Sequence, residues 1–194
     1  MTDEVQTQPI SLDDLIAMRE RVEIINGEIV EMAAAGAIHQ IIGSNIFVVV
    51  HPLVIEKQLG AVFYDGMTFL MHSPARRLKD SFVPDISFIR NENIPVNWDP
   101  NKPHPGVPDL AIEIVSPGDD PDDLQTKRKT FLAKGTEQVW IIYPQTREVH
   151  QFRRDNNPEI RIYKEGEKLD CEALFPGLVL TTDMIFNLPA WAIK

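Results

Sequence analysis

Alternating hydrophobic and polar positions predict a β-hairpin close to the N-terminus. Two alternating runs, residues 21–25 and 28–32, flank the dipeptide Asn26-Gly27, which is typical of two-residue hairpin turns. With such a turn Glu23 lies opposite Val30, on the face that also carries Ile25. Upstream, Ser11 followed by two aspartates is a helix N-cap signature, and it predicts a short helix that ends near residue 18.

A longer apolar pattern predicts one helix over residues 38–59. Its apolar positions recur with helical spacing, and the segment is too long for a single strand. These positions are Ile38, Ile41, Ile42, Ile46, Val49, Val50 and Leu53. Because proline lacks an amide hydrogen, we expect Pro52 to kink or break the helix, and Gly60 fits its end.

The rest of the chain is predicted to form strands around a second helix. Residues 61–64 and 67–71 flank Asp65-Gly66 and predict another hairpin, and residues 83–89 predict a strand. Residues 110–115 and 139–143 are almost continuously apolar, as in strands that are covered on both faces. Between them Asp120-Pro121 opens a helix that stops at Gly135, and residues 148–153 and 160–163 form a last strand pair. This order predicts an α/β (α+β) fold with a central mixed sheet flanked by helices.

Length and composition fit one ordinary soluble domain. The chain has 194 residues, of which 43% are hydrophobic and 25% charged, so we expect a single domain over residues 11–194 behind a loose N-terminal segment, residues 1–10. No apolar run reaches the roughly 18 residues of a membrane span, and the acidic, polar N-terminus is unlike a secretory signal. The single cysteine, Cys171, excludes an internal disulfide. We therefore expect a cytoplasmic protein with no membrane partner.

The charge balance restricts the class of partner. The chain has 19 Lys and Arg residues against 29 Asp and Glu residues, a formal net charge of −10 at pH 7. Such a surface repels polyanions at long range. A nucleic-acid partner would then need a local basic patch or bridging metal ions.

One acidic residue stands in an unusual place, although the common catalytic motifs are absent. The chain has no Gly-rich phosphate loop, no HExxH and no GxSxG, and its five His residues show no ligand spacing. Glu113, in contrast, interrupts the apolar run 110–115, on the face that Ala111 and Val115 share. A buried carboxylate needs a cation, a metal ion or access to water. A structural salt bridge, or an edge strand with Glu113 in solvent, would also explain it.

A second acid and a lysine complete the set of candidates. Asp85 follows Pro84 at the start of a strand, a position that is also typical of a turn or a cap. On the helix after Glu113, Lys127 and Arg128 flank the apolar stripe, whereas Lys129 points away from it. Lys127 either extends along the apolar surface to solvent or reaches the acid on the preceding strand. Two acids and a lysine are what metal-assisted phosphodiester hydrolysis needs, since carboxylates hold a hard divalent cation and the lysine stabilises negative charge.

Together these residues resemble the PD-(D/E)XK nuclease superfamily, and more closely its Uma-type restriction endonucleases, formerly a domain of unknown function. The resemblance runs from about residue 11 to residue 186. It rests on Val22-Glu-Ile-Ile-Asn-Gly-Glu-Ile-Val, Ile38-His-Gln, Val83-Pro-Asp-Ile-Ser-Phe-Ile, Pro108-Asp-Leu-Ala-Ile-Glu-Ile-Val-Ser-Pro, Asp123-Leu-Gln-Thr-Lys-Arg-Lys-Thr-Phe-Leu-Ala-Lys-Gly, Val139-Trp-Ile-Ile-Tyr-Pro and Phe175-Pro-Gly-Leu.

The resemblance implies a restriction-endonuclease-like fold with Mg²⁺ or Mn²⁺ at Asp85 and Glu113. It also implies that Lys127 assists catalysis from the following helix, because Val115 replaces the superfamily's lysine two residues after the acid. A second departure is Tyr143-Pro144, where the family usually has Asp-Pro.

Two further residues match the family. Glu23 matches a glutamate near the site, with a surface acid of the hairpin as the alternative. His39 is a candidate for direct contact with the metal, although helix capping or packing would explain it too.

These observations favour a divalent-metal-dependent, endonuclease-like hydrolase that cleaves phosphodiester bonds of DNA. A basic stripe that includes Arg76, Arg77, Lys79, Arg128 and Lys129 would attract the DNA locally. The alternative is a catalytically silent nuclease-fold module for binding or assembly, which the net charge favours. A third interpretation is a soluble domain whose two acids belong to unrelated salt bridges.

The same hypothesis predicts a homodimer. Enzymes that cut both strands of a duplex often use two-fold symmetry, and the apolar C-terminal segment, residues 184–193, offers hydrophobic surface for an interface. Packing of this segment on its own domain is the alternative.

Overall fold

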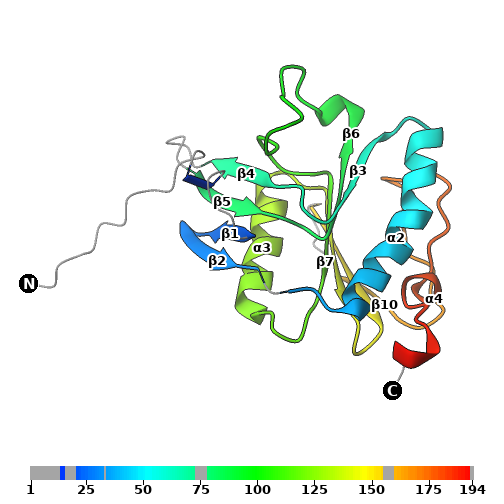
Figure 1. Cartoon of the computed structure of the whole chain (residues 1–194). Helices are drawn as coiled ribbons and strands as arrows, with labels where there is room; N and C mark the ends of the chain where they lie inside the picture. The colour runs from blue at the N-terminus through cyan, green and yellow to red at the C-terminus, as the bar shows by residue number, and fades with distance from the viewer. Residues whose placement is uncertain (1–13, 16–20, 33, 73–77, 155–159, 193–194) are drawn as a thin grey trace, which may run out of the picture.

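A computed structural model describes residues 14–15, 21–32, 34–72, 78–154 and 160–192 (Figure 1). The predicted loose segment 1–10 lies outside the described residues, and so does the predicted N-terminal helix except for Asp14 and Leu15, which are helical. The elements are, in chain order, β1 (Val22–Ile25), β2 (Glu28–Glu31), α2 (Ala37–Glu56), β3 (Gly60–Tyr64), β4 (Phe69–His72), β5 (Leu78–Phe82), β6 (Ile86–Arg90), β7 (Leu110–Ile114), α3 (Pro121–Lys134), β8 (Gln138–Tyr143), β9 (Glu148–Arg153), β10 (Arg161–Tyr163) and α4 (Thr182–Ile185).

A six-stranded mixed sheet forms the centre of the molecule, as the sequence predicts. Its strand order is β10-β9-β8-β7-β6-β3, with β7 and β8 parallel and the other pairs antiparallel. The two apolar runs become the neighbouring strands β7 and β8, and the last two predicted strands pair as β9 and β10. Helix α2 packs on one face of the sheet, and α3 packs on the other (Figure 1).

A smaller sheet of order β2-β1-β5-β4 stands beside the large one (Figure 1). The predicted hairpin around Asn26-Gly27 is confirmed, and Glu23 pairs with Val30 as expected. Both turn residues have positive φ, 53° for Asn26 and 88° for Gly27, which these two residue types tolerate. The hairpin carries Glu23 toward α3.

The hairpin predicted around Asp65-Gly66 is wrong. Strand β3 before the turn pairs with β6, whereas β4 after it pairs with β5, so the turn connects the two sheets instead of closing a hairpin. Asp65 donates its amide hydrogen to the carbonyl oxygen of Asp85 across 2.8 Å, which ties this turn to the start of β6. The sequence also predicts one strand over residues 83–89, but the chain runs as β5 up to Phe82 and starts again as β6 at Ile86.

Both long helices form over nearly the predicted ranges. Helix α3 begins at Pro121 behind the N-cap Asp120, whose side chain accepts a hydrogen bond from the amide of Asp122, and Gly135 ends it. Helix α2 continues through Pro52 to Glu56, so the proline does not break it. By length and composition alone α2 could cross a membrane, but one of its faces is buried against the large sheet.

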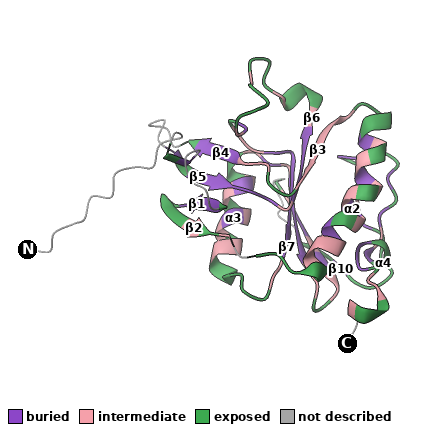
Figure 2. Ribbon diagram, viewed as in Figure 1, coloured by how far each residue is buried: buried purple, intermediate pink, exposed green. Residues whose placement is uncertain are grey.

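Burial follows these layers (Figure 2). One core cluster joins α2 to the face of β7 that carries Leu110, Ile112 and Ile114. A second cluster joins Phe131 of α3 to Ala111 on the opposite face of β7 and to the small sheet. Glu113 shares that second face, so α3 and the small sheet decide its surroundings.

Candidate active site

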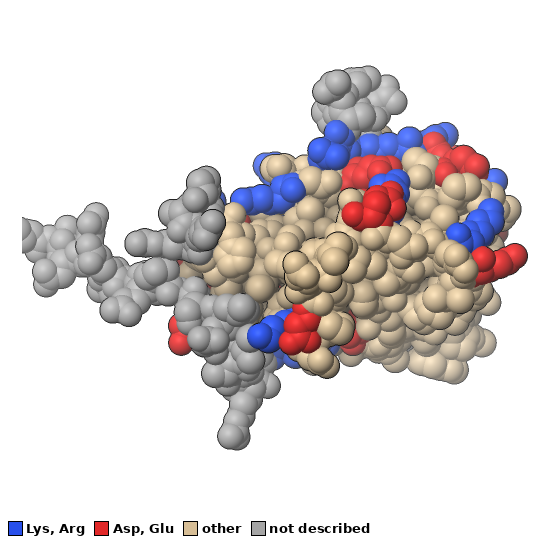
Figure 3. Space-filling model, turned by 90° about the horizontal axis from the view of Figure 1, so that it is seen from above, with Lys and Arg blue, Asp and Glu red and all other residues tan. Residues whose placement is uncertain are grey.

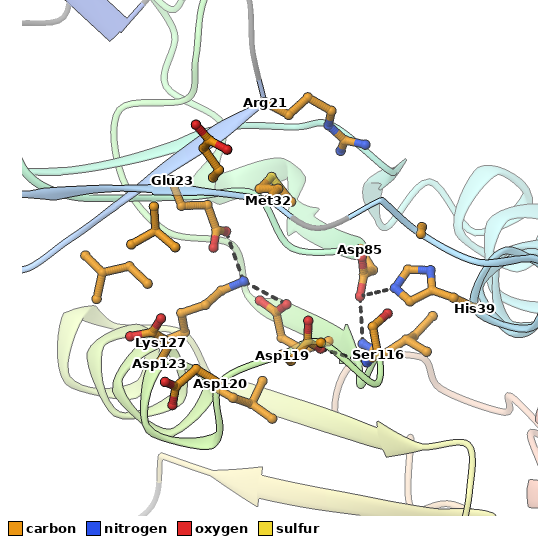
Figure 4. A pocket seen from close by; sticks show the side chains of 18 of the residues that line it. Arg21, Glu23, Met32, His39, Asp85, Ser116, Asp119, Asp120, Asp123 and Lys127 are labelled. Atoms are coloured by element: carbon orange, nitrogen blue, oxygen red, sulfur yellow. Dashed lines mark hydrogen bonds and ion pairs between the residues drawn. The ribbon is translucent and has the colours of Figure 1, made fainter.

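The two predicted acids stand at neighbouring strand ends and open into one pocket of about 200 Å³ (Figure 4). Glu113 lies in β7 between β6 and β8, and its side chain is about nine-tenths buried. The edge-strand explanation for Glu113 is therefore wrong. Asp85 precedes β6, the other neighbour of β7, and lines the same pocket.

Asp85 is fixed by two contacts. Its Oδ2 accepts a hydrogen bond from the amide of Ile114 across 2.6 Å, and the same oxygen lies 3.1 Å from His39 Nε2 (Figure 4). The first contact links the start of β6 to the end of β7. The second brings the first turn of α2 to the site, so His39 contacts Asp85 instead of serving only in helix capping.

Lys127 lies between two carboxylates. Its Nζ donates to Glu113 Oε2 across 2.9 Å and lies 2.9 Å from Glu23 Oε1 (Figure 4). The same Glu23 oxygen accepts a hydrogen bond from the amide of Val83 across 2.7 Å. The lysine thus reaches the acid on the preceding strand, and Glu23 is a buried residue of the pocket instead of a surface acid of the hairpin. The salt bridge considered for Glu113 exists, and it is part of the candidate site.

The pKa values of the site residues are shifted by burial and by the charges of Glu23, Asp85, Glu113 and Lys127. Burial raises the pKa of Glu113 to about 8, and the nearby charges of Asp85 and Glu23 add to this against the opposing charge of Lys127. Burial alone would lower the pKa of Lys127, but Glu113 and Glu23 outweigh it, so the pKa lies above its usual value and the ammonium keeps its proton. Burial likewise opposes protonation of His39, but its hydrogen bond to Asp85 and the charge of Asp85 raise the pKa of the imidazole.

The donor set suits a hard divalent cation. Glu113 Oε1 is buried and has no hydrogen-bond partner, and Asp85 offers a second carboxylate in the same pocket. Among the residues that the structure describes, no three His, Cys, Asp or Glu side chains are grouped closely enough to hold a metal ion alone. A divalent cation here would need water ligands besides these carboxylates, as Mg²⁺ usually has in proteins.

Several acids of the pocket were not predicted from the sequence. Asp119, Asp120 and Asp123 line its mouth from the loop before α3 and the first turn of α3 (Figure 4). Asp119 Oδ2 accepts a hydrogen bond from the amide of Ser116 across 2.7 Å and so shapes the loop after β7. The run Asp119-Asp-Pro-Asp-Asp was a usable signal, but it indicates a helix start equally well.

The members of the predicted basic stripe that the structure describes come from two different elements, β5 and α3. Arg76 and Arg77 lie outside the described residues. Lys79 is exposed on β5 of the small sheet, whereas the Arg128 guanidinium lies 4.3 Å from the Phe152 ring of the large sheet. Lys129 is exposed and points away from the core, as predicted. On the face that Figure 3 shows, Lys and Arg side chains lie among Asp and Glu side chains near the rim around a broad uncharged area.

Comparison with known proteins gives this pocket a context. The family model Uma2, described as "Putative restriction endonuclease", matches residues 11–183. The chain belongs to this Uma2 family. The crystal structure of a putative nuclease of the DUF820 group from Anabaena variabilis superposes with a TM-score of 0.78 at 24% sequence identity, covering 92% of this chain and 98% of that one. The search of curated proteins found no match.

Within this Uma2-family fold the structure shows what occupies position 115, where the superfamily has a lysine, and how Lys127 reaches Glu113 from the following helix. Val115 stands two residues after Glu113, on the same face of the strand, and it packs with the second core cluster. Lys127 instead approaches Glu113 from α3, one layer above the strand. An ammonium therefore reaches Glu113 from α3 and not from position 115.

Proposed function

We propose that the protein is a divalent-metal-dependent endonuclease that hydrolyses phosphodiester bonds of DNA. The observation that carries the proposal is the convergence of Asp85, Glu113 and Lys127 on one pocket, with a buried Glu113 oxygen left unpaired. Membership of the Uma2 family and the likeness in fold to a putative nuclease support it. Carboxylates beside a buried ammonium form an electrostatic arrangement suited to a phosphate that gains negative charge during reaction.

The residues would divide the work in a definite way. Asp85 and Glu113 would hold Mg²⁺ or Mn²⁺, which when bound supplies Lewis-acid polarisation of the phosphate and a more acidic water. Asp85 is already oriented by the Ile114 amide and His39, so it loses little rotational freedom on binding. Lys127 places a fixed positive charge beside the pocket, and Glu23, anchored by the Val83 amide, holds the ammonium in place.

Nicking of supercoiled plasmid DNA, with and without Mg²⁺ or Mn²⁺, tests this proposal. We expect Glu113→Ala to lose Mn²⁺ binding and cleavage together, because a metal ligand is gone. Lys127→Ala should keep Mn²⁺ binding, measured by calorimetry, but lose cleavage by about 10²–10³-fold, as is typical of losing one electrostatic stabiliser. The exposed Lys129→Ala is the matched control and should change neither.

Two outcomes would contradict these assignments. Equal nicking by wild type and Glu113→Ala would attribute the activity to a contaminant. If Lys129→Ala were inactive and Lys127→Ala active, the functional lysine would be Lys129, on the exposed side of α3, and the assignment of Lys127 would be wrong.

A catalytically silent binding module is the second candidate, and one observation favours it. The pocket mouth carries Asp119, Asp120 and Asp123, and the whole chain has a net charge of −10, so an approaching phosphate meets repulsion. Mn²⁺ binding without any nicking by the wild type would support this candidate over the enzyme.

A further inference from the structure

A second, larger cavity adjoins the candidate active site. Its volume is about 590 Å³, and it lies between the start of α2 and the loops that follow β7 and β8. Its walls are mainly apolar or aromatic and include Ile38, Val115, Pro117, Tyr143 and Pro144. Cavities of roughly 300–1,000 Å³ with few polar groups are typical of small-molecule sites in proteins.

The two cavities share part of their lining. His39, Ser116 and Asp119 line both of them, so a group in the apolar cavity would lie next to a phosphate in the acidic pocket. The acidic pocket, at about 200 Å³, has room for a phosphate and a cation but not for a nucleotide as well. The apolar cavity has the size and the lining that a nucleobase needs.

An aromatic ring lines this second cavity, and two sources of positive potential lie near it. The Tyr143 ring lines it and is supported by the His150 ring, whose centroid is 4.5 Å away. Arg128 and Tyr143 both line a neighbouring groove. The first turn of α2 borders the cavity, with an N-cap, Gly36, that has no side chain and with no acidic residue. A helix N-terminus of this kind attracts phosphate.

We propose that the apolar cavity binds an unstacked nucleobase of the substrate strand, next to the scissile phosphate. This inference rests on the proposed nuclease function and specifies its substrate: a DNA strand with unpaired bases at the cut position. The base stacks on Tyr143, while Arg128 and the first turn of α2 attract the flanking phosphates. Stacking on an aromatic ring is the usual way in which proteins hold single-stranded bases, because every base has a π-face.

The preference for an unpaired base also fits the charge of the molecule. A rigid duplex would bring many phosphates toward a protein of net charge −10, which repels them at long range. A single base inserted into an apolar cavity gains contact area without adding charge at the acidic mouth. Apolar contact and stacking can thus supply affinity that long-range attraction does not.

Fluorescence anisotropy with a labelled single-stranded DNA oligonucleotide and its duplex tests the inference, with Ca²⁺ in place of Mg²⁺ so that binding is measured without cleavage. We expect tighter binding of the single strand. Tyr143→Ala should weaken that binding by about 5- to 100-fold and leave duplex binding unchanged, because only the stacking surface is lost. Tyr143→Phe keeps the ring and should bind as the wild type does.

A second pair of variants tests the inference even if Tyr143→Ala does not fold. Ala37 is exposed in the first turn of α2 and lines the cavity. Ala37→Glu suits a helix N-terminus, so the protein should fold, but its charge should repel the strand and weaken binding at least about tenfold more than Ala37→Gln does. Equal affinity for single strand and duplex, or equal binding by Ala37→Glu and Ala37→Gln, would overturn the inference.

The nicking and binding experiments together distinguish a failure of the nuclease proposal from a failure of the proposed base-binding cavity. Plasmid nicking that depends on Glu113, together with no preference for single strands, would leave the nuclease proposal standing and reject the base cavity. Selective single-strand binding that depends on Tyr143, without any nicking, would reject the nuclease proposal and keep the binding site.

Discussion

Lys127 controls the charge of the candidate site, because its ammonium is held between Glu23 and Glu113 with little access to water. Each carboxylate oxygen lies 2.9 Å from Nζ, and all three side chains are at least about nine-tenths buried. Removing Lys127 breaks its buried ion pair with Glu23 and leaves the charge of that carboxylate uncompensated in a medium that solvates it poorly. The stability of the fold therefore depends on the positive charge that Lys127 places beside the buried acids of the pocket.

We expect Lys127→Met to lower the free energy of unfolding by about 3–5 kcal/mol in the absence of divalent ions. Mn²⁺ should restore part of the loss, because a cation held by Asp85 and Glu113 would bring positive charge back into the pocket. Urea denaturation with and without Mn²⁺ measures both effects. Lys129→Met removes an exposed lysine from the same helix and serves as the control. Equal stability of the two variants would contradict a structural role for the buried ammonium.

The raised pKa values of Glu113 and His39 predict that stability falls as the pH rises. Between its ordinary 4.5 and about 8, Glu113 keeps a proton in the folded protein that the unfolded chain releases, so the folded state is favoured at the acidic side of this window. His39, with a pKa above 6.5, acts in the same direction. Denaturation of the metal-free protein across this window should give a smaller slope for Glu113→Gln than for wild type. An identical slope would argue against titration of Glu113 here.

Among the elements, turn chemistry predicted local structure better than it predicted pairing. Asn26-Gly27 closes a hairpin, but Asp65-Gly66, an equally strong signal, connects two different sheets. The difference lies in distant partners: β3 pairs with β6, which follows it by more than twenty residues, and no local pattern records that competition. The local sequence pattern therefore predicts turns and strands, but it does not predict which strands pair over long distances in the chain.

Strand β5 escaped prediction because its sequence contains buried polar residues. Asp80 is buried, and its Oδ1 accepts a hydrogen bond from the amide of Asn26 across 2.9 Å. A carboxylate that satisfies a backbone amide can replace an apolar residue at a core position, yet in the sequence it reads as a loop signal. The residues of the candidate site were easier to predict from the sequence. Glu113 is an acid inside an apolar run and Lys127 is a lysine beside an apolar stripe, so both stand out from the hydrophobic pattern around them.

The pairing of β3 with β6 depends on the absence of a side chain at Gly60. A Cβ placed there would lie 1.9 Å from the carbonyl oxygen of Ile89. We expect Gly60→Ala to lower the free energy of unfolding by about 2 kcal/mol or more, because backbone atoms must move apart. Gly118→Ala is the control, since a Cβ at Gly118 meets nothing within 4 Å. Thermal denaturation of the two variants gives the comparison, and matching midpoints would contradict the close approach.

For the molecule as a whole, the predicted homodimer rests on the proposed reaction more than on the C-terminal segment. Ile185 and Phe186 are buried in the core of their own domain, so the alternative that this segment packs on its own domain holds for these two residues. Trp191 stays 66% exposed. The expectation of a homodimer then depends mainly on the two-fold relation of the strands in a duplex.

Light scattering should give twice the 22.0 kDa mass of the chain if duplex cutting uses two copies related by a dyad. The measurement should be made at micromolar concentration, with and without DNA. A 22.0 kDa species under both conditions would contradict the dimer, and it would suit an enzyme that cuts one strand at a time.

The order in which the site residues occur along the chain has a consequence for synthesis on the ribosome. Glu23 comes from the small sheet, Glu113 from the large sheet, and Lys127 from the helix that follows, so the contact between Glu23 and Lys127 spans more than half of the 194 residues. A nascent chain that has emerged as far as residue 100 carries Glu23 and Asp85 but neither Glu113 nor its lysine. A fragment, a stalled translation product or a proteolysed chain that lacks α3 therefore lacks Lys127. The candidate site is complete only in molecules whose two sheets have already joined.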